Sequence, residues 1–142
     1  MIAVDTIDKL VDFYYKHENH NPDVELEDLR HFFSVLLSYD QIIIERENDE
    51  IVGYLEYFKL NYAQFGWIVC GNYFDIAKHN ITDGNIAYFA NVLIRPDKRK
   101  QWVVKSLKKE FFKRTADCEF ITGHKNGKRY KPIAVFRRRR KA

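Results

Sequence analysis

Residues 85–114 read NIAYFANVLIRPDKRKQWVVKSLKKEFFKR, and this stretch decides the fold. Its first part, Asn85–Arg95, is almost entirely apolar, which predicts a strand that is covered on both faces and therefore central in a sheet. Pro96 cannot donate to a strand ladder and ends this strand. From Asp97 to Arg114 the apolar residues recur at helical spacing, so a helix follows. The predicted inner face of that helix consists of Val103, Val104, Leu107 and Phe111.

The flanking segments show the same two periodicities. Two helices are predicted before the central strand, over Thr6–His17 and over the segment that carries the apolar stripe from Leu26 to Leu37. Short strands bounded by turn residues are predicted at Gln41–Arg46, Ile51–Leu60, Cys118–Gly123 and Ile133–Phe136, and Tyr62–Val69 has the pattern of a short helix. The order is therefore helix, helix, strand, strand, an irregular segment in which the short helix is one alternative, strand, helix, strand, strand; the sequence leaves the structure of residues 61–82 open. This order indicates an α/β (α+β) protein with a single domain over residues 1–136 and a basic tail over residues 137–142.

Composition places the chain among soluble globular proteins. It has 142 residues, of which 46% are hydrophobic and 15% aromatic, enough for one packed domain. The two cysteines, Cys70 and Cys118, are far apart, which favours free thiols in a reducing compartment over a disulfide framework. The first residues lack a signal-peptide pattern, and no apolar stretch approaches membrane-spanning length. We expect a cytoplasmic protein that does not cross a membrane.

Charge is distributed unevenly along the sequence. Residues 1–60 hold 14 acidic and 5 basic residues, a net charge of −9, and residues 95–142 hold 4 acidic and 18 basic residues, a net charge of +14. Such asymmetry is typical of a surface that binds a polyanion, either nucleic acid or the phosphates of a cofactor. A domain whose two halves attract each other, or a head-to-tail dimer, would have the same pattern.

The segment Ile94-Arg95-Pro96-Asp97-Lys98-Arg99, with Leu107 farther along the helix, resembles the cofactor motif of the Gcn5-related N-acetyltransferase (GNAT) superfamily. The hairpin sequence Val52-Gly53-Tyr54 is also similar to a strand of that family. The resemblance implies a mixed central sheet flanked by helices and acetyl-coenzyme A as cofactor. In the family the cofactor pyrophosphate is bound by backbone amides at a helix N-terminus. Carried over to this chain, the cofactor-binding residues are Ile94, Arg99, Lys100, Gln101, Trp102, Val103 and Val104.

This chain departs from the family motif at its glycine positions, which are Lys100, Trp102 and Val104. Glycine lets a phosphate approach the backbone closely, whereas the indole of Trp102 would lie where the phosphate passes. Either the cofactor is bound differently or it is not bound.

The resemblance also implies a general base and a general acid. Asn85–Arg95 contains no carboxylate, so Glu56 on the neighbouring hairpin strand is the candidate base. Tyr130 is the candidate acid that protonates the leaving thiolate. Each residue has a simpler interpretation: Glu56 as a solvated strand residue, and Tyr130 as an aromatic anchor for the C-terminal segment.

A basic surface is predicted on the helix after Pro96, where Trp102, Lys105, Lys109 and Lys113 recur at spacings of three and four. Lys128, Arg129 and the terminal Arg/Lys run extend the positive charge. Lysines neutralise phosphates and an exposed tryptophan stacks on bases, so a polyanion, either nucleic acid or the phosphates of coenzyme A, is the candidate partner. A solvated helix face, or neutralisation by the acidic N-terminal half, would also explain the pattern. The spacing of the histidines and cysteines predicts no metal site.

Three functions remain open from the sequence. The first is a divergent N-acyltransferase that uses acetyl-coenzyme A. The second is a GNAT-fold protein without catalysis, acting as a nucleic-acid-associated or structural binding protein of the kind that bacteriophages and mobile elements carry, in the host cytoplasm or the virion. The third is transfer chemistry on nucleic acid itself.

Overall fold

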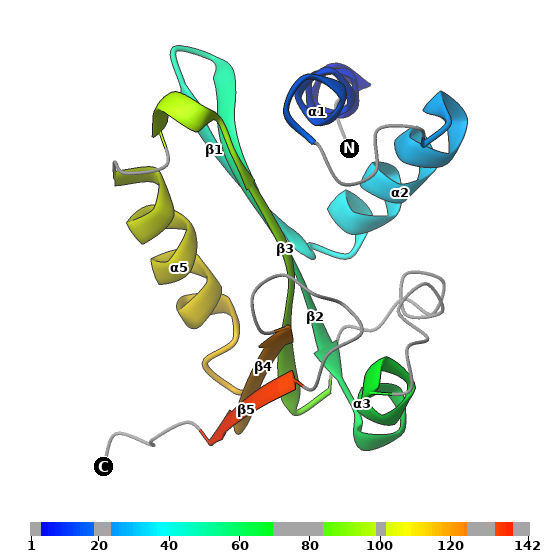
Figure 1. Ribbon diagram of the computed structural model, residues 1–142, viewed down its shortest axis with the longest axis vertical. Helices are drawn as coiled ribbons and strands as arrows, with labels where there is room; N and C mark the ends of the chain where they lie inside the picture. Colours follow the sequence, from blue (N-terminus) through cyan, green and yellow to red (C-terminus); the bar gives the residue numbers. More distant parts are fainter. Residues whose placement is uncertain (1–3, 19–23, 70–83, 99–101, 125–132, 138–142) are drawn as a thin grey trace. The chain divides into compact units, whose positions relative to one another are not determined.

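The computed structural model describes residues 4–18, 24–69, 84–98, 102–124 and 133–137 (Figure 1). The elements follow the predicted order. They are α1 (Val4–His17), α2 (Leu26–Ser38), β1 (Ile42–Glu47), β2 (Glu50–Leu60), α3 (Tyr62–Val69), β3 (Ile86–Ile94), the 3₁₀ turn η1 (Pro96–Lys98), α5 (Trp102–Arg114), β4 (Phe120–His124) and β5 (Ile133–Arg137). None of the helices among these residues is long and apolar enough to cross a membrane.

One mixed sheet contains the five strands in the order β1-β2-β3-β4-β5. The pair β1/β2 is antiparallel, β3/β4 is parallel and β4/β5 is antiparallel. β3 therefore lies in the middle of the sheet, which confirms the central strand predicted from its apolar sequence. A parallel neighbour requires a crossover connection, and α5 provides it between β3 and β4.

Contacts divide the chain into two compact units. The first comprises Met1–Glu56 with Val92–Glu110, and the second comprises Tyr57–Asn91 with Phe111–Ala142. Each unit therefore combines an earlier and a later stretch of the chain. The single domain over residues 1–136 stays a prediction.

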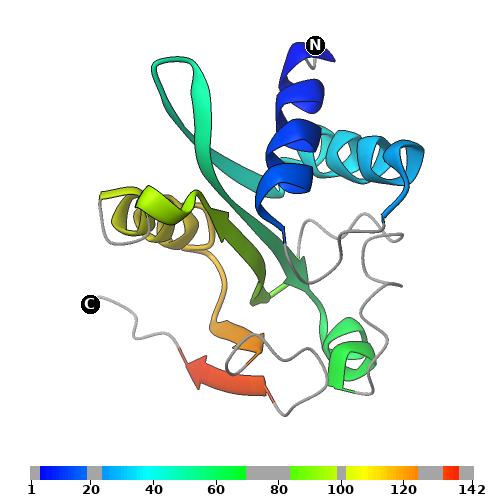
Figure 2. The same cartoon turned by 45° about the horizontal axis from the view of Figure 1, so that its top comes forward.

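In the first unit, α1 and α2 cover one face of the β1/β2 hairpin, and the start of α5 lies on the other face (Figure 2). The ring of Tyr54, on β2, meets Phe13 of α1 at a centroid distance of 5.9 Å and Phe33 of α2 at 5.6 Å, both edge to face. Such pairs add to the free energy of burial. All three side chains are buried, so they form the core beneath the helices.

Gly53 lets α5 approach the opposite face of β2. A Cβ at this position would lie 3.0 Å from Cγ1 of Val103 and 3.3 Å from Cγ1 of Ile94. The missing side chain thus makes room for the first turn of α5 and for the end of β3. The glycine of the hairpin sequence Val52-Gly53-Tyr54 therefore has a packing role here.

The second unit is built around aromatic rings. Phe58 of β2 stacks on Tyr88 of β3 at 6.5 Å, and Phe111 of α5 meets Tyr57 at 5.8 Å and Phe89 at 5.6 Å. The parallel register of β3 with β4 runs from Ile86↔Phe120 to Phe89↔Gly123. β3 itself continues to Ile94.

The helix after Pro96 differs from its prediction in one respect. The α-helix was expected from Asp97, but Pro96–Lys98 forms a single 3₁₀ turn and α5 begins at Trp102. The Lys98 amide donates to the Arg95 carbonyl at 2.8 Å, an i to i−3 bond that closes a tighter turn than an α-helix does. On α5 itself Val103, Leu107 and Phe111 are buried as predicted, whereas Val104 is half-buried.

Candidate functional site at the start of helix α5

The end of β3 is fixed to β2 before the chain turns into α5. The Arg95 amide donates to the Val52 carbonyl at 2.9 Å, and Ile94 is buried against the Gly53 gap. Pro96 then lacks an amide hydrogen and starts η1. The turn therefore leaves the sheet at one defined point.

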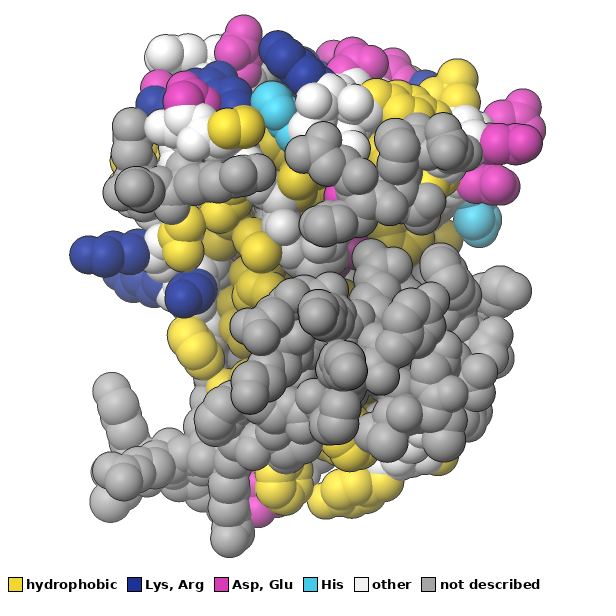
Figure 3. All heavy atoms as spheres, viewed as in Figure 1, with side chains coloured by type: hydrophobic (Ala, Val, Ile, Leu, Met, Phe, Trp, Pro, Cys, Tyr) yellow, Lys and Arg dark blue, Asp and Glu magenta, His cyan; other side chains and the backbone are white. Residues whose placement is uncertain are grey.

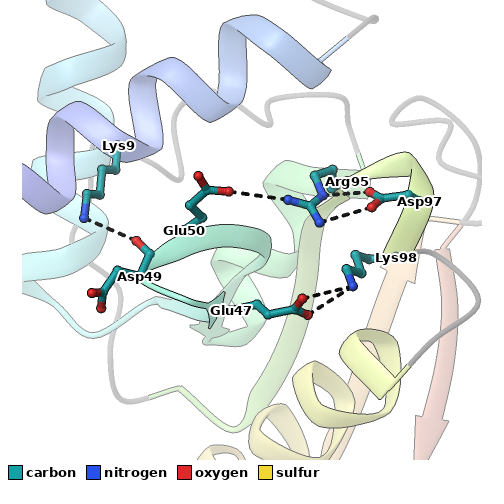
Figure 4. A network of polar contacts seen from close by, with 7 residues as sticks. All are labelled: Lys9, Glu47, Asp49, Glu50, Arg95, Asp97 and Lys98. Atoms are coloured by element: carbon teal, nitrogen blue, oxygen red, sulfur yellow. Dashed lines mark hydrogen bonds and ion pairs between the residues drawn. The ribbon is translucent and has the colours of Figure 1, made fainter.

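A polar network holds η1 against the β1/β2 hairpin (Figure 4). Arg95 donates from Nε and Nη2 to the two carboxylate oxygens of Asp97, at 2.7 and 3.1 Å, and its Nη1 lies 3.7 Å from Glu50. Lys98 Nζ donates to Glu47 at 3.2 Å. Each surface pair contributes little by itself, because solvent screens the charges. Together they fix the direction in which the chain enters α5, and they occupy Arg95 and Lys98.

The Arg95 guanidinium shifts the titration of its neighbour. The hydrogen bond from Arg95, reinforced by its charge, holds the pKa of the Asp97 carboxyl below its usual value. In turn, the hydrogen bond to Asp97 raises the pKa of Arg95. Asp97 is therefore an anion whose charge is already matched when a second anion approaches α5.

Replacing Arg95 by glutamine is expected to raise the pKa of Asp97. Because this pKa is lowered in the folded protein, the pair stabilises the fold above the unfolded pKa of about 3.9. That stabilisation is lost as the pH falls through the folded value. Titrating the Asp97 carboxyl carbon by NMR in the parent and in Arg95→Gln measures the shift. Arg30→Gln, which removes the guanidinium paired with Asp8, is the control. If the titration midpoint of Asp97 were the same in Arg95→Gln as in the parent, the assignment would be contradicted.

The first turn of α5 is open to an anion. Trp102, its first residue, is 44% exposed, and the turn contains no acidic residue. The first four amides of a helix have no partner within it, and the helix dipole adds positive potential there. The Val103 side chain is buried against Gly53 and belongs to the core, so only the backbone amide of Val103 could bind an anion. Arg99, Lys100 and Gln101 lie outside the described residues.

Glu56 lies inside the protein. It is only 3% exposed, so its interpretation as a solvated strand residue is wrong. The reason is that β2 is covered on both faces, and seven of its residues besides Glu56 are buried, from Ile51 to Phe58. Side chains alternate along a strand, so Glu56 shares the face of Tyr54, toward α1 and α2. Trp102 and Val103 lie on the other side of β2, and the structure does not bring them to one face with Glu56. Tyr130 lies outside the described residues.

The basic residues predicted on α5 are exposed. Lys105, Lys109 and Lys113 face solvent, and Figure 3 shows Lys and Arg side chains projecting over α5 at the left. Sequence reasoning missed two further members of this face, Lys108 and the 46% exposed Phe112. Their helical spacing from Lys105 and Lys109 could have revealed them. Lys128 and Arg129 lie outside the described residues, and among those described no three His, Cys, Asp or Glu side chains are grouped to hold a metal ion.

No protein-family model matches the sequence, and no curated protein sequence matches it. Solved structures do match the fold. The loading GNATL domain of CurA from Lyngbya majuscula is 16% identical, with a TM-score of 0.62 over 86% of this chain and 61% of that chain. The GphF GNAT-like decarboxylase, solved with isobutyryl-CoA, is 11% identical, with a TM-score of 0.63 over 86% of this chain and 62% of that chain. The polyamine N-acetyltransferase of Drosophila melanogaster is 11% identical, with a TM-score of 0.60 over 87% and 73%.

These similarities establish the fold. The chain has a GNAT-like architecture, a mixed sheet flanked by helices, as its resemblance implied. It spans less than two thirds of the length of the first two solved structures.

Proposed function

We propose that this protein is an N-acyltransferase that binds a coenzyme A thioester at the start of α5. The observation that carries the proposal is the strand–turn–helix unit β3–η1–α5, which ends in an exposed first turn without acidic side chains. Two solved structures of the same fold support it, because the GphF GNAT-like decarboxylase is a complex with isobutyryl-CoA and the diaminobutyrate acetyltransferase EctA from Paenibacillus lautus is a complex with coenzyme A.

The backbone amides and positive charge at this turn suit a pyrophosphate that passes beside the exposed indole of Trp102, which stands at a glycine position of the family motif. Gly53 allows α5 to lie close against the sheet, so its first amides are fixed in place before a ligand arrives. The amides of Trp102 and Val103 would donate to phosphate oxygens, and Arg99 and Lys100 would add positive charge. Asp97, the nearest described carboxylate in the sequence, is neutralised by Arg95. The bound thioester would supply an activated acyl group.

Glu56 is the residue we assign to proton removal; it lies on the face of β2 opposite Trp102 and Val103, so the acyl group of a thioester bound at α5 would have to extend past β2 to reach the acceptor amine. An ionised carboxylate is costly to bury, and such placements are concentrated at functional sites. Glu56 would accept the proton of the acceptor amine as the new amide bond forms and the thioester C–S bond breaks. Tyr130 would give its proton to the leaving sulfur. Because Glu56 faces α1 and α2, the acceptor is expected to enter from the side of these helices.

Calorimetric titration with acetyl-coenzyme A tests the binding half of the proposal. We expect micromolar affinity for the parent. Two variants of the first helical residue then test the contribution of its backbone amide. Trp102→Ala keeps the backbone amide, whereas Trp102→Pro removes it at a position where proline is compatible with a helix. Because Trp102→Pro loses a hydrogen bond to a charged phosphate, its affinity for acetyl-coenzyme A should be at least about tenfold lower than that of Trp102→Ala. The absence of heat with the parent at millimolar ligand, or equal affinities for the two variants, would contradict the proposed site.

A further inference from the structure

The solvent-facing side of α5 combines lysines with exposed aromatic rings. At 3.6 residues per turn its members fall within an arc of about 140°, opposite the buried Val103, Leu107 and Phe111. We define this α5 outer face as Trp102, Lys105, Lys108, Lys109, Phe112 and Lys113. It shares Trp102 with the proposed acyl-transfer site, whereas Lys108, Lys109, Phe112 and Lys113 lie beyond the first turn of the helix.

The lysines of the α5 outer face have no acidic partner within the described part of the chain. Elsewhere the described basic side chains are largely matched: Lys9 pairs with Asp5, Arg30 with Asp8, Lys59 with Asp117, Arg95 with Asp97 and Lys98 with Glu47. No such pair involves Lys105, Lys108, Lys109 or Lys113. Neutralisation by the acidic N-terminal half therefore does not account for these four lysines within the described residues. Their charge is available to an external anion.

Two large rings stand among these lysines. Trp102 is 44% exposed and Phe112 is 46% exposed, and ten residues of helix separate them, about 15 Å along the axis. Exposed rings of this size lose the free energy that burial would give. A ligand that offers flat apolar surfaces would recover it. Unpaired nucleobases are such surfaces, and stacking on aromatic side chains is tolerant of base identity.

We infer that the α5 outer face binds single-stranded nucleic acid, with the lysines on the phosphates and Trp102 and Phe112 stacking on unpaired bases. The charge selects a polyanion, and the rings distinguish a single strand from a duplex, whose base faces are already stacked. Lysine contacts to phosphates release counterions, so the affinity must fall with salt.

Fluorescence anisotropy with a labelled oligodeoxythymidylate tests the charge contribution. In Lys109→Gln/Lys113→Gln we expect binding to weaken about fivefold per lysine at 0.1 M salt, and the slope of log K against log salt to fall by about 1.4. Lys9→Gln/Lys16→Gln removes the same charge from α1 and should change affinity less than twofold. An equal loss in both double variants would overturn the assignment to α5, since it would report net charge alone.

Trp102→Ala tests the stacking contribution. We expect at least about a fivefold loss of oligonucleotide affinity and unchanged affinity for heparin, a polyanion without bases. Equal losses with both ligands, or a duplex that binds the parent as tightly as the single strand, would overturn the inference. Acetyl-coenzyme A titration of Lys109→Gln/Lys113→Gln separates the two proposals, because this variant should keep its cofactor affinity. Circular dichroism of every variant verifies that it is folded.

Discussion

Replacing Glu56 by glutamine is expected to lower kcat/KM for acyl transfer at least about 100-fold, the usual contribution of a general base. Glutamine has nearly the same shape but cannot accept a proton near neutral pH. The Glu56 side chain is 3% exposed and shares its strand face with Tyr54, so the replacement changes a group inside the protein. Release of free thiol from acetyl-coenzyme A, with a panel of small primary amines and lysine peptides as acceptors, measures the rate.

The stability of the Glu56→Gln variant distinguishes chemistry from folding. Glutamine keeps the size and hydrogen-bonding capacity of the side chain, so the variant is expected to remain folded, and its thermal midpoint measures any loss of stability separately from the rate. Glu27→Gln, in the exposed first turn of α2, is the matched control and should keep full activity. If Glu56→Gln kept the parent rate while remaining folded, the base would have to be another group.

The largest effect on stability is expected from Gly84→Ala. A Cβ at Gly84 would lie 2.0 Å from the carbonyl carbon of Leu60, 2.1 Å from its oxygen and 2.6 Å from the amide nitrogen of Asn61. All three atoms are backbone, so no side-chain rotation can relieve the overlap. The Gly84 amide also donates to the Lys59 carbonyl at 3.2 Å, which holds the two segments together. We expect a loss of about 3 kcal/mol or more, at the upper end of overpacking substitutions.

Urea unfolding measures the stability of Gly84→Ala, and Gly66→Ala is the matched control. A Cβ at Gly66, inside α3, would meet nothing within 4 Å. Alanine is favoured over glycine in a helix by about 1 kcal/mol, so Gly66→Ala should be neutral or stabilising. The same midpoint for Gly84→Ala and the parent would show that the two backbones are farther apart than described.

The fold could be predicted because its main signals are local and periodic. The apolar run of β3 and the helical spacing of Val103, Leu107 and Phe111 each identify one element without knowledge of its neighbours. The start of α5 could not be predicted this way. The hydrogen bonds between Arg95 and Asp97 accompany a 3₁₀ turn. Such a polar pair does not change the spacing of apolar residues, from which the helix was predicted.

The candidate site was less predictable for a similar reason. Glu56 was identified as a candidate base, but a strand sequence does not reveal whether a helix covers its polar positions, and here α1 and α2 cover that face. Likewise, the sequence shows where the lysines of α5 are without showing which carboxylates are already taken. Among the described residues, the pairs formed by Lys9, Arg30 and Lys98 show acidic side chains of residues 1–60 bound to bases outside the α5 outer face.

The composition of the first unit has a consequence for the protein during its synthesis. Residues 1–56 emerge from the ribosome well before residues 92–110, yet both stretches are needed to complete this unit. Until Val103 is translated, the gap at Gly53 has nothing to fill it, and the nascent hairpin presents an apolar surface. Contacts so distant in sequence form slowly and expose a chain to aggregation. The nascent chain is therefore most vulnerable while the segment between these two stretches is being translated.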